Sequence, residues 1–181
     1  MKKYLSLIIV LMSLKARANT CKRLMDCVSE ATALTGLKYI YPEKMFNDKH
    51  ELNVEMILNK SDADKVLSEA LAVFDFVIIP TNVSKVFKII PANELLDHPN
   101  LPTFQASKSK TPVIPKTQDP IHLIYQTQKG INSEALSMSL HPLVSRFGRI
   151  INLKSGAIII VDRASSILKI LPILQAGDSR P

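Results

Sequence analysis

The sequence predicts an α+β protein built from two small modules. Apolar residues recur at helical spacing in several stretches, and short runs rich in β-branched residues lie between these stretches. A third observation is a change in composition over residues 92–120, where prolines, lysines and small polar residues gather. Helices and strands mixed in this way form small sheets covered by helices.

Residues 1–18 have the pattern of an export signal. Lys2 and Lys3 precede an apolar run over residues 4–14, and Ala16 and Ala18 supply the small residues that a signal peptidase recognises. The alternative, an uncleaved membrane anchor, is less favoured because a membrane span needs about 20 apolar residues. We therefore expect cleavage between Ala18 and Asn19 and release of the protein into the periplasm.

The basic character of the chain belongs partly to this signal. The formal net charge is +7, and four of the basic residues lie before the predicted cleavage site, namely Lys2, Lys3, Lys15 and Arg17. The mature protein is therefore much closer to neutral, which argues against a nucleic-acid partner.

Cys21 and Cys27 are the only cysteines. On one helix they would lie about 240° apart, which is poor geometry for a bridge. We expect two isolated thiols, and a disulfide would require non-helical chain between them.

The first module is predicted to span residues 19–91. Leu24, Val28 and Ala31 recur at helical spacing before Gly36, and Pro42 stops a short strand over residues 37–41. A strand over residues 51–58 and a helix beginning after Ser61 or Asp62 follow. Two runs around Pro80 complete the module as a hairpin, over residues 76–79 and 85–90.

The last strand of this hairpin is a candidate edge for binding a partner. Edge strands present unpaired N–H and C=O groups, and lysines on them discourage indiscriminate pairing. The alternative is an internal strand. The candidate residues are Lys85, Val86, Phe87, Lys88, Ile89 and Ile90.

Residues 92–120 are predicted to form a semi-extended linker. The segment contains five prolines separated by polar residues, so it should bury too little apolar surface to become ordered. We expect proteases to cut it first and to leave two resistant fragments.

The second module is predicted over residues 121–177, in the order strand, helix, strand, strand, helix. Asn132 or Ser133 begins a helix that runs to residue 147 and that Pro142 must kink or break. Residues 149–153 and 157–161 form a hairpin, and Asp162 caps a final helix whose last turn is uncertain because of Pro172. Leu140, Ile158 and Ile160 are expected to meet in the core.

Catalytic and metal-binding patterns are not found in the sequence. The four histidines, His50, His98, His122 and His141, lie far apart, and no glycine-rich phosphate loop or nucleophile elbow occurs. We expect no enzyme activity, no cofactor and no metal.

The second module resembles the repeated periplasmic N-domain of bacterial outer-membrane secretins. The residues that carry the resemblance are the strand at 121–125, the helix with Pro142 inside it, Gly148 after it, and the strand at 156–161 that runs into Asp162 and Ile167. The resemblance implies a βαββα fold of the KH-like kind. KH modules clamp nucleic acid with a Gly-x-x-Gly loop, which this sequence lacks.

The first module resembles the domain at the N-terminus of secretins, shared with TonB-dependent signalling receptors. The matching residues lie at 33–37, 66–71 and 86–91. One departure is that the family's domain opens with a strand, whereas a helix is predicted here almost from the mature N-terminus.

Such domains form periplasmic rings below an outer-membrane pore and bind envelope proteins of type II secretion or type IV pilus systems. The resemblance therefore implies an assembly or interaction module without the pore-forming barrel, with a separately encoded secretin barrel as one expected partner and a homo-oligomeric ring as one expected assembly. The alternative is a stand-alone envelope signalling or ligand-binding domain that acts by edge-strand addition.

Overall fold

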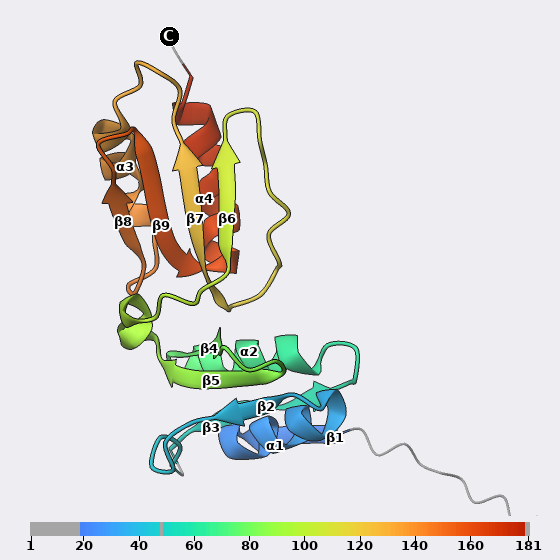
Figure 1. Ribbon diagram of the computed structural model, residues 1–181. Coiled ribbons are helices and arrows are strands. Elements are labelled where there is room, and N and C mark those ends of the chain that lie inside the picture. Colours follow the sequence, from blue (N-terminus) through green and yellow to red (C-terminus); the bar gives the residue numbers. More distant parts are fainter. Residues whose placement is uncertain (1–18, 48, 180–181) are drawn as a thin grey trace, which may run out of the picture.

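The computed structural model describes residues 19–47 and 49–179 (Figure 1). The predicted signal peptide and Ala18 lie outside these residues. Two bodies are stacked end to end: the strands of the second body run along the length of the molecule, and those of the first run across it. None of the helices in the described ranges is long and apolar enough to cross a membrane.

The first module contains two helices and two small sheets. Its elements are β1 (Asn19–Arg23), α1 (Leu24–Thr35), β2 (Lys38–Ile40), β3 (Glu51–Leu58), α2 (Ala63–Val73), β4 (Phe76–Pro80) and β5 (Val86–Pro91). Strands β1 and β3 pair antiparallel, and β2, β5 and β4 form a second sheet in that order. The helices contact each other and strands of both sheets, so Leu24, Leu67 and Leu71 share one core with Leu58 and Ile89.

The described chain opens with a strand, which corrects the helix predicted from Cys21. Residues 19–23 pair with residues 51–58, and α1 begins only at Leu24. This change of direction places Cys21 and Cys27 on different elements, with their Cα atoms 5.0 Å apart, and they form a disulfide. The prediction of two isolated thiols is therefore wrong, because the chain between Cys21 and Cys27 is not a single helix.

Residues 92–120 are not a semi-extended linker. They contain the 3₁₀ helix η1 (Ala92–Asp97) and the strand β6 (Thr103–Ser107), which pairs parallel with β7. Leu95, Leu101, Ala106 and Ile114 are buried. The composition suggested disorder, but a few well-spaced apolar residues suffice when a neighbouring sheet offers an edge and a core to cover.

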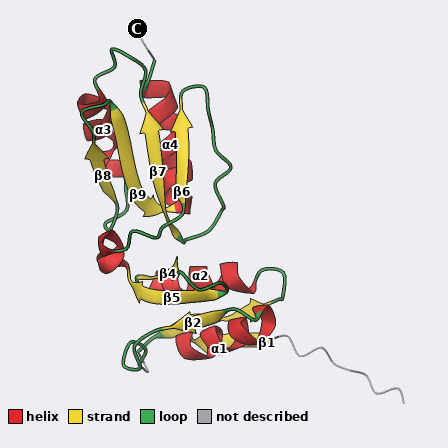
Figure 2. Cartoon of the chain, viewed as in Figure 1, coloured by secondary structure: helices red, strands yellow, loops and turns green. Residues whose placement is uncertain are grey.

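The second module adds β7 (Pro120–Gln126), α3 (Ser133–Leu140), η2 (His141–Leu143), β8 (Arg149–Asn152), β9 (Ala157–Arg163) and α4 (Ala164–Gly177). The sheet has the order β6-β7-β9-β8, and both helices cover one of its faces (Figure 2). Leu140, Ile158 and Ile160 are fully buried together, which confirms the predicted core.

Two details of the predicted helices change, and one is confirmed. Helix α3 ends at Leu140 rather than at residue 147, since the chain enters a 3₁₀ turn at Pro142. Helix α4, by contrast, continues through Pro172 to Gly177. Asn132 caps α3 as expected, and its side chain accepts a hydrogen bond from the Ala135 N–H at 3.0 Å.

Asp162 does not cap α4, although the sequence suggested that role. Arg163 occupies the N-cap position, and the buried Asp162 carboxylate instead accepts from the N–H and the hydroxyl of Ser145, at 2.7 and 2.6 Å. A Cβ at Gly148 would come within 2.7 Å of this carboxylate. The glycine after the first helix is therefore needed for close packing of the loop against β9.

Candidate functional site

The predicted partner-binding strand is not at an edge. Strand β5 lies in the middle of its sheet, with Lys38 to Ile40 paired parallel to residues 86–88 and β4 paired antiparallel on the other side. Lys85 precedes the strand in a left-handed conformation (φ 60°), and its carbonyl accepts from the Lys38 N–H. The prediction of an edge over Lys85–Ile90 is corrected, because the hairpin pattern revealed β4 but not the distant β2.

Unpaired edges occur instead on the two-stranded sheet. Strand β3 has eight residues and pairs, among the described strands, only with the five-residue β1. Val54 and Ile57 on β3 are 65% and 57% exposed. Polar side chains link the two strands: Lys22 pairs with Glu51 at 2.7 Å, and this hydrogen bond lowers the pKa of Glu51.

The two modules meet through a buried apolar cluster. Strand β4 contributes Val77 and Ile79, and Val161 comes from β9 of the second module. Residues 92–101, which belong to the segment predicted to be a linker, fill the space between these strands. Its buried members are Ala92, Leu95 and Leu101, with Ile90 beside them.

Charged and polar side chains also cross the junction. Asp75, in the turn before β4, pairs with Arg146 and, at 3.8 Å, with Arg163. At another point the Ser68 hydroxyl of α2 donates to Asp119 at 2.8 Å. Burial lowers the pKa of Arg163, which the nearby Asp162 partly offsets.

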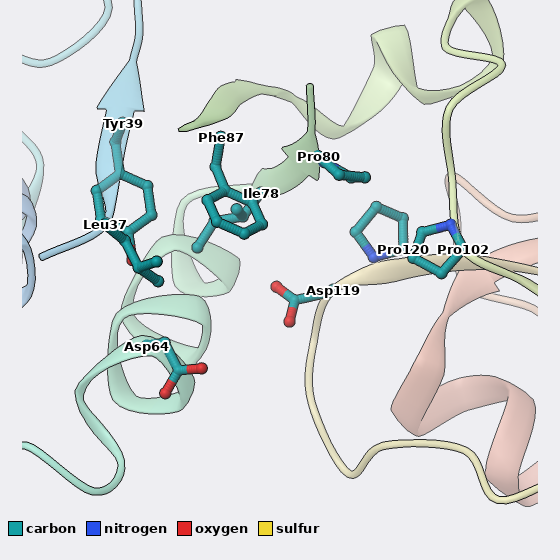
Figure 3. A pocket seen from close by; sticks show the side chains of 9 residues that line it. All are labelled: Leu37, Tyr39, Asp64, Ile78, Pro80, Phe87, Pro102, Asp119 and Pro120. Carbon is teal, nitrogen blue, oxygen red and sulfur yellow. The ribbon is translucent and has the colours of Figure 1, made fainter. Parts of the chain in front are cut away.

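A cavity of about 150 Å³ lies at the junction on the side of Asp119 (Figure 3). Four side chains of the first module form its main apolar wall, from Leu37, Tyr39, Ile78 and Phe87. Prolines 80, 102 and 120 add apolar surface, and the carboxylates of Asp64 and Asp119 complete the lining. Of these residues, only Phe87 belongs to the partner-binding strand predicted from the sequence, and the cavity itself forms only where both modules are in contact.

Asp119 and Tyr39 are held in a poorly solvated setting. Burial raises the pKa of Asp119, and the hydrogen bond from Ser68 opposes this rise. Burial also raises the pKa of Tyr39 to about 12, with a smaller contribution from Asp64. The Tyr39 hydroxyl is buried and has no hydrogen-bond partner in the described part of the chain.

Among the residues that the structure describes, no group of three or more histidine, cysteine, aspartate or glutamate side chains could hold a metal ion. His50 lies among Phe46, Phe74 and Phe76, and its Nδ1 accepts from the Asn47 N–H. The half-buried ring therefore belongs to an aromatic cluster in the first module.

Solved structures provide the comparisons, since no family model and no curated protein matches the chain. A chain of the Klebsiella pneumoniae type II secretion system outer membrane complex, with PulD, PulS and the PulC HR domain, is similar over 90% of this chain. The TM-score is 0.69 and the sequence identity 15%. The match covers 26% of that chain, so this protein spans about a quarter of its length.

Two further similar structures have lower TM-scores. A dimeric mutant of the N-terminal domain of the secretin XcpQ from Pseudomonas aeruginosa has a TM-score of 0.32 at 15% identity, with 89% of this chain and 64% of that chain covered. The GspC–GspD complex of the type II secretion system from enterotoxigenic Escherichia coli has a TM-score of 0.31 at 13% identity, with 89% and 96% covered. The chain therefore shares its α+β fold with part of a chain of the Klebsiella type II secretion outer membrane complex, which confirms the fold class predicted from the sequence.

Proposed function

We propose that this protein is a periplasmic interaction module of a type II secretion apparatus, which binds another envelope protein and catalyses no reaction. The observation that carries the proposal is the similarity of 90% of the chain to part of the Klebsiella outer membrane complex. That assembly contains PulD, PulS and the PulC HR domain. Type II secretion is preferred over type IV pilus assembly for the same reason.

The periplasm follows from the predicted signal peptide. Lys2, Lys3 and the apolar run after them favour export, and Ala18 precedes the expected cleavage site. A disulfide between Cys21 and Cys27 supports an oxidising compartment. N-terminal sequencing of the exported protein should begin at Asn19, and a full-length membrane-retained product would contradict the assignment.

The outer edge of β3 is the proposed docking strand. One face of the β1–β3 sheet packs on the helices, and the outer edge of β3 is left with backbone N–H and C=O groups that no described strand pairs. Addition of a partner's strand would supply backbone hydrogen bonds. The exposed side chains of Val54 and Ile57 would provide apolar contacts for side chains of that strand. This edge takes the place of the β5 edge that the topology rules out.

The test measures binding to the periplasmic domain of an inner-membrane type II secretion component from the same genome. Val54→Glu and Ile57→Glu should each weaken binding at least tenfold, because they place a charge beside the docking strand. Val73→Glu on α2 and Val83→Glu in the β4–β5 turn are matched controls, since their parent side chains are 65% and 61% exposed.

All four variants alter exposed side chains and should keep the circular dichroism spectrum of the parent. If the control substitutions weaken binding as much as those on β3, the β3 edge is not the docking strand. If the parent protein binds no envelope component of the apparatus, the interaction-module function itself is wrong.

A further inference from the structure

The cavity at the junction combines an apolar wall with carboxylates at one side. Leu37, Tyr39 and Phe87 face it from the first module, and Pro120 closes it from the second. Figure 3 shows Asp64 on α2 and Asp119 in the loop just before β7, with the Asp119 carboxylate directed toward α2. The cavity is therefore amphipathic rather than uniformly apolar.

The two carboxylates carry charge that the described protein does not neutralise. Neither Asp64 nor Asp119 belongs to an ion pair within the described residues. The Ser68 hydroxyl donates to Asp119 at 2.8 Å, and the Thr117 side chain also hydrogen-bonds to this carboxylate, but both partners are uncharged and leave its charge unneutralised. Asp119 is largely buried, and a buried carboxylate without a cation is costly, so the arrangement is complementary to a positively charged group.

The size of the cavity limits what can bind. An apolar cavity of about 150 Å³ can hold benzene, a molecule of six heavy atoms. Beyond Cβ, a lysine side chain has three methylene carbons and one nitrogen. The cavity volume of about 150 Å³ therefore accommodates it. Its alkyl stem matches the wall of Leu37, Ile78 and Phe87, and its ammonium group has three donors for carboxylate oxygens.

We propose that this cavity binds the side chain of a lysine presented by a protein partner. The source of the lysine rests on the proposed function, whereas the chemistry of the cavity stands without it. An uncharged aliphatic side chain would leave both carboxylates unpaired. A divalent cation would find two carboxylates and no third acidic or histidine ligand among the described residues.

The electrostatic state of the lining agrees with a cationic occupant. Burial raises the pKa of Asp119, and the nearby Asp64 and Glu69 raise it further. Asp64 also contributes to the raised pKa of Tyr39. These effects all indicate negative potential in a poorly solvated space, which an ammonium group would relieve.

The test titrates the purified protein with Nα-acetyl-lysine methylamide and follows the NMR signals of Tyr39, Ile78 and Phe87. Nα-acetyl-norleucine methylamide is the uncharged comparison, because it keeps the alkyl stem and lacks the ammonium. We expect saturable shifts with the lysine compound, and binding about tenfold weaker or more for norleucine.

Asp64→Asn and Asp119→Asn should each weaken binding of the lysine compound about tenfold. Asp64 is exposed, so its variant should fold normally, and the amide at residue 119 can still accept from Ser68. Asp26→Asn is the matched control, since Asp26 is in the first turn of α1 as Asp64 is in the first turn of α2. This variant should bind as the parent does.

Absence of saturable shifts, equal binding of the norleucine compound, or an equal loss in Asp26→Asn would each overturn the proposal. These outcomes do not depend on any secretion component, so they separate a failure of the cavity assignment from a failure of the proposed function. A protein that binds the lysine compound but no envelope component retains the cavity and loses the assembly role.

Discussion

The junction between the two modules has two unlike regions. In one, Val77, Ile79 and Val161 pack with the buried residues of segment 90–101, and Asp75 pairs with two arginines nearby. In the other, Asp119 and its neighbours leave a cavity of about 150 Å³ with unneutralised carboxylates. The first region holds the modules together, and the second is the proposed site for a lysine side chain.

The difference comes from how β4 is used. Phe76, Val77, Ile78 and Ile79 are all buried, so this strand is covered on both faces. Ile78 faces the core of its own module and lines the cavity, whereas Val77 and Ile79 belong to the cluster shared with the second module. Docking therefore uses the outer face of a strand that would otherwise expose aliphatic side chains to water.

The largest effect should come from the packed region. Leu95→Ala removes a side chain that is 2% exposed and should lower the free energy of unfolding by about 2–5 kcal/mol, as for other large-to-small core changes. Urea denaturation measures the change. Leu143→Ala, at a side chain 44% exposed, is the control and should be nearly neutral.

A near-neutral result for Leu95→Ala would restore the mobile linker that the composition of residues 92–120 suggested. It would also remove the basis for a fixed cavity, because the lining comes from both modules. Division of the chain into two independently folding domains, at 19–91 and 121–177, remains a proposal that the same experiment addresses through the number of unfolding transitions.

A second change acts away from the junction, on the β1–β3 sheet. Replacement of Cys21 and Cys27 by alanine opens a short loop and should cost about 2 kcal/mol by the loop-entropy relation. Thermal unfolding of the double variant and of the parent in reducing agent should agree. Equal stability of the oxidised parent and the variant would mean that the bridge does not constrain the unfolded chain.

Most helices and strands could be predicted because their periodicity is local. Strand β3 and the stripe on α2 are visible in short windows, as are the buried Ile158 and Ile160. The secretin-like motifs around Pro142 and Gly148 also depend on neighbouring residues. The fold class follows from such local patterns.

What could not be predicted depends on pairing between distant segments. Three-residue β2 joins β5 across more than forty residues, which makes β5 internal. Strand β6 is ordered by its parallel partner β7 rather than by its own composition. One usable signal was present: unbroken apolar runs at 76–79 and 157–161 indicate strands covered on both faces, and both meet at the junction.

A smaller effect is expected from the ion pairs of the packed region. Asp75 has a left-handed backbone (φ 61°), which asparagine tolerates equally well, so Asp75→Asn isolates the charge. The partly exposed pairs should contribute about 1 kcal/mol or less. Urea denaturation at low and high salt should show that the parent loses this increment in salt while the variant does not.

Glu43→Gln is the control for that comparison, since Glu43 is exposed and forms no ion pair within the described residues. Salt dependence that is the same in all three proteins would show that Asp75 does not fasten the modules. The packed region would then depend on its apolar cluster alone.

The smallest effect concerns the cavity region and is a dependence on pH. Burial raises the pKa of Asp119, so the folded protein holds this proton more tightly than the unfolded chain does. Stability from this group is therefore present at low pH and is lost as the pH rises from the ordinary aspartate pKa through the raised value. Asp119→Asn removes the titration and keeps an acceptor for Ser68.

The unfolding free energy of the variant minus that of the parent should rise across the acid range and then level off. A lysine compound bound in the cavity should reduce this difference at neutral pH, because its ammonium offsets the ionised carboxylate. A difference that is flat with pH would mean that Asp119 is solvated like an ordinary surface acid, and the two regions of the junction would then differ in packing but not in electrostatics.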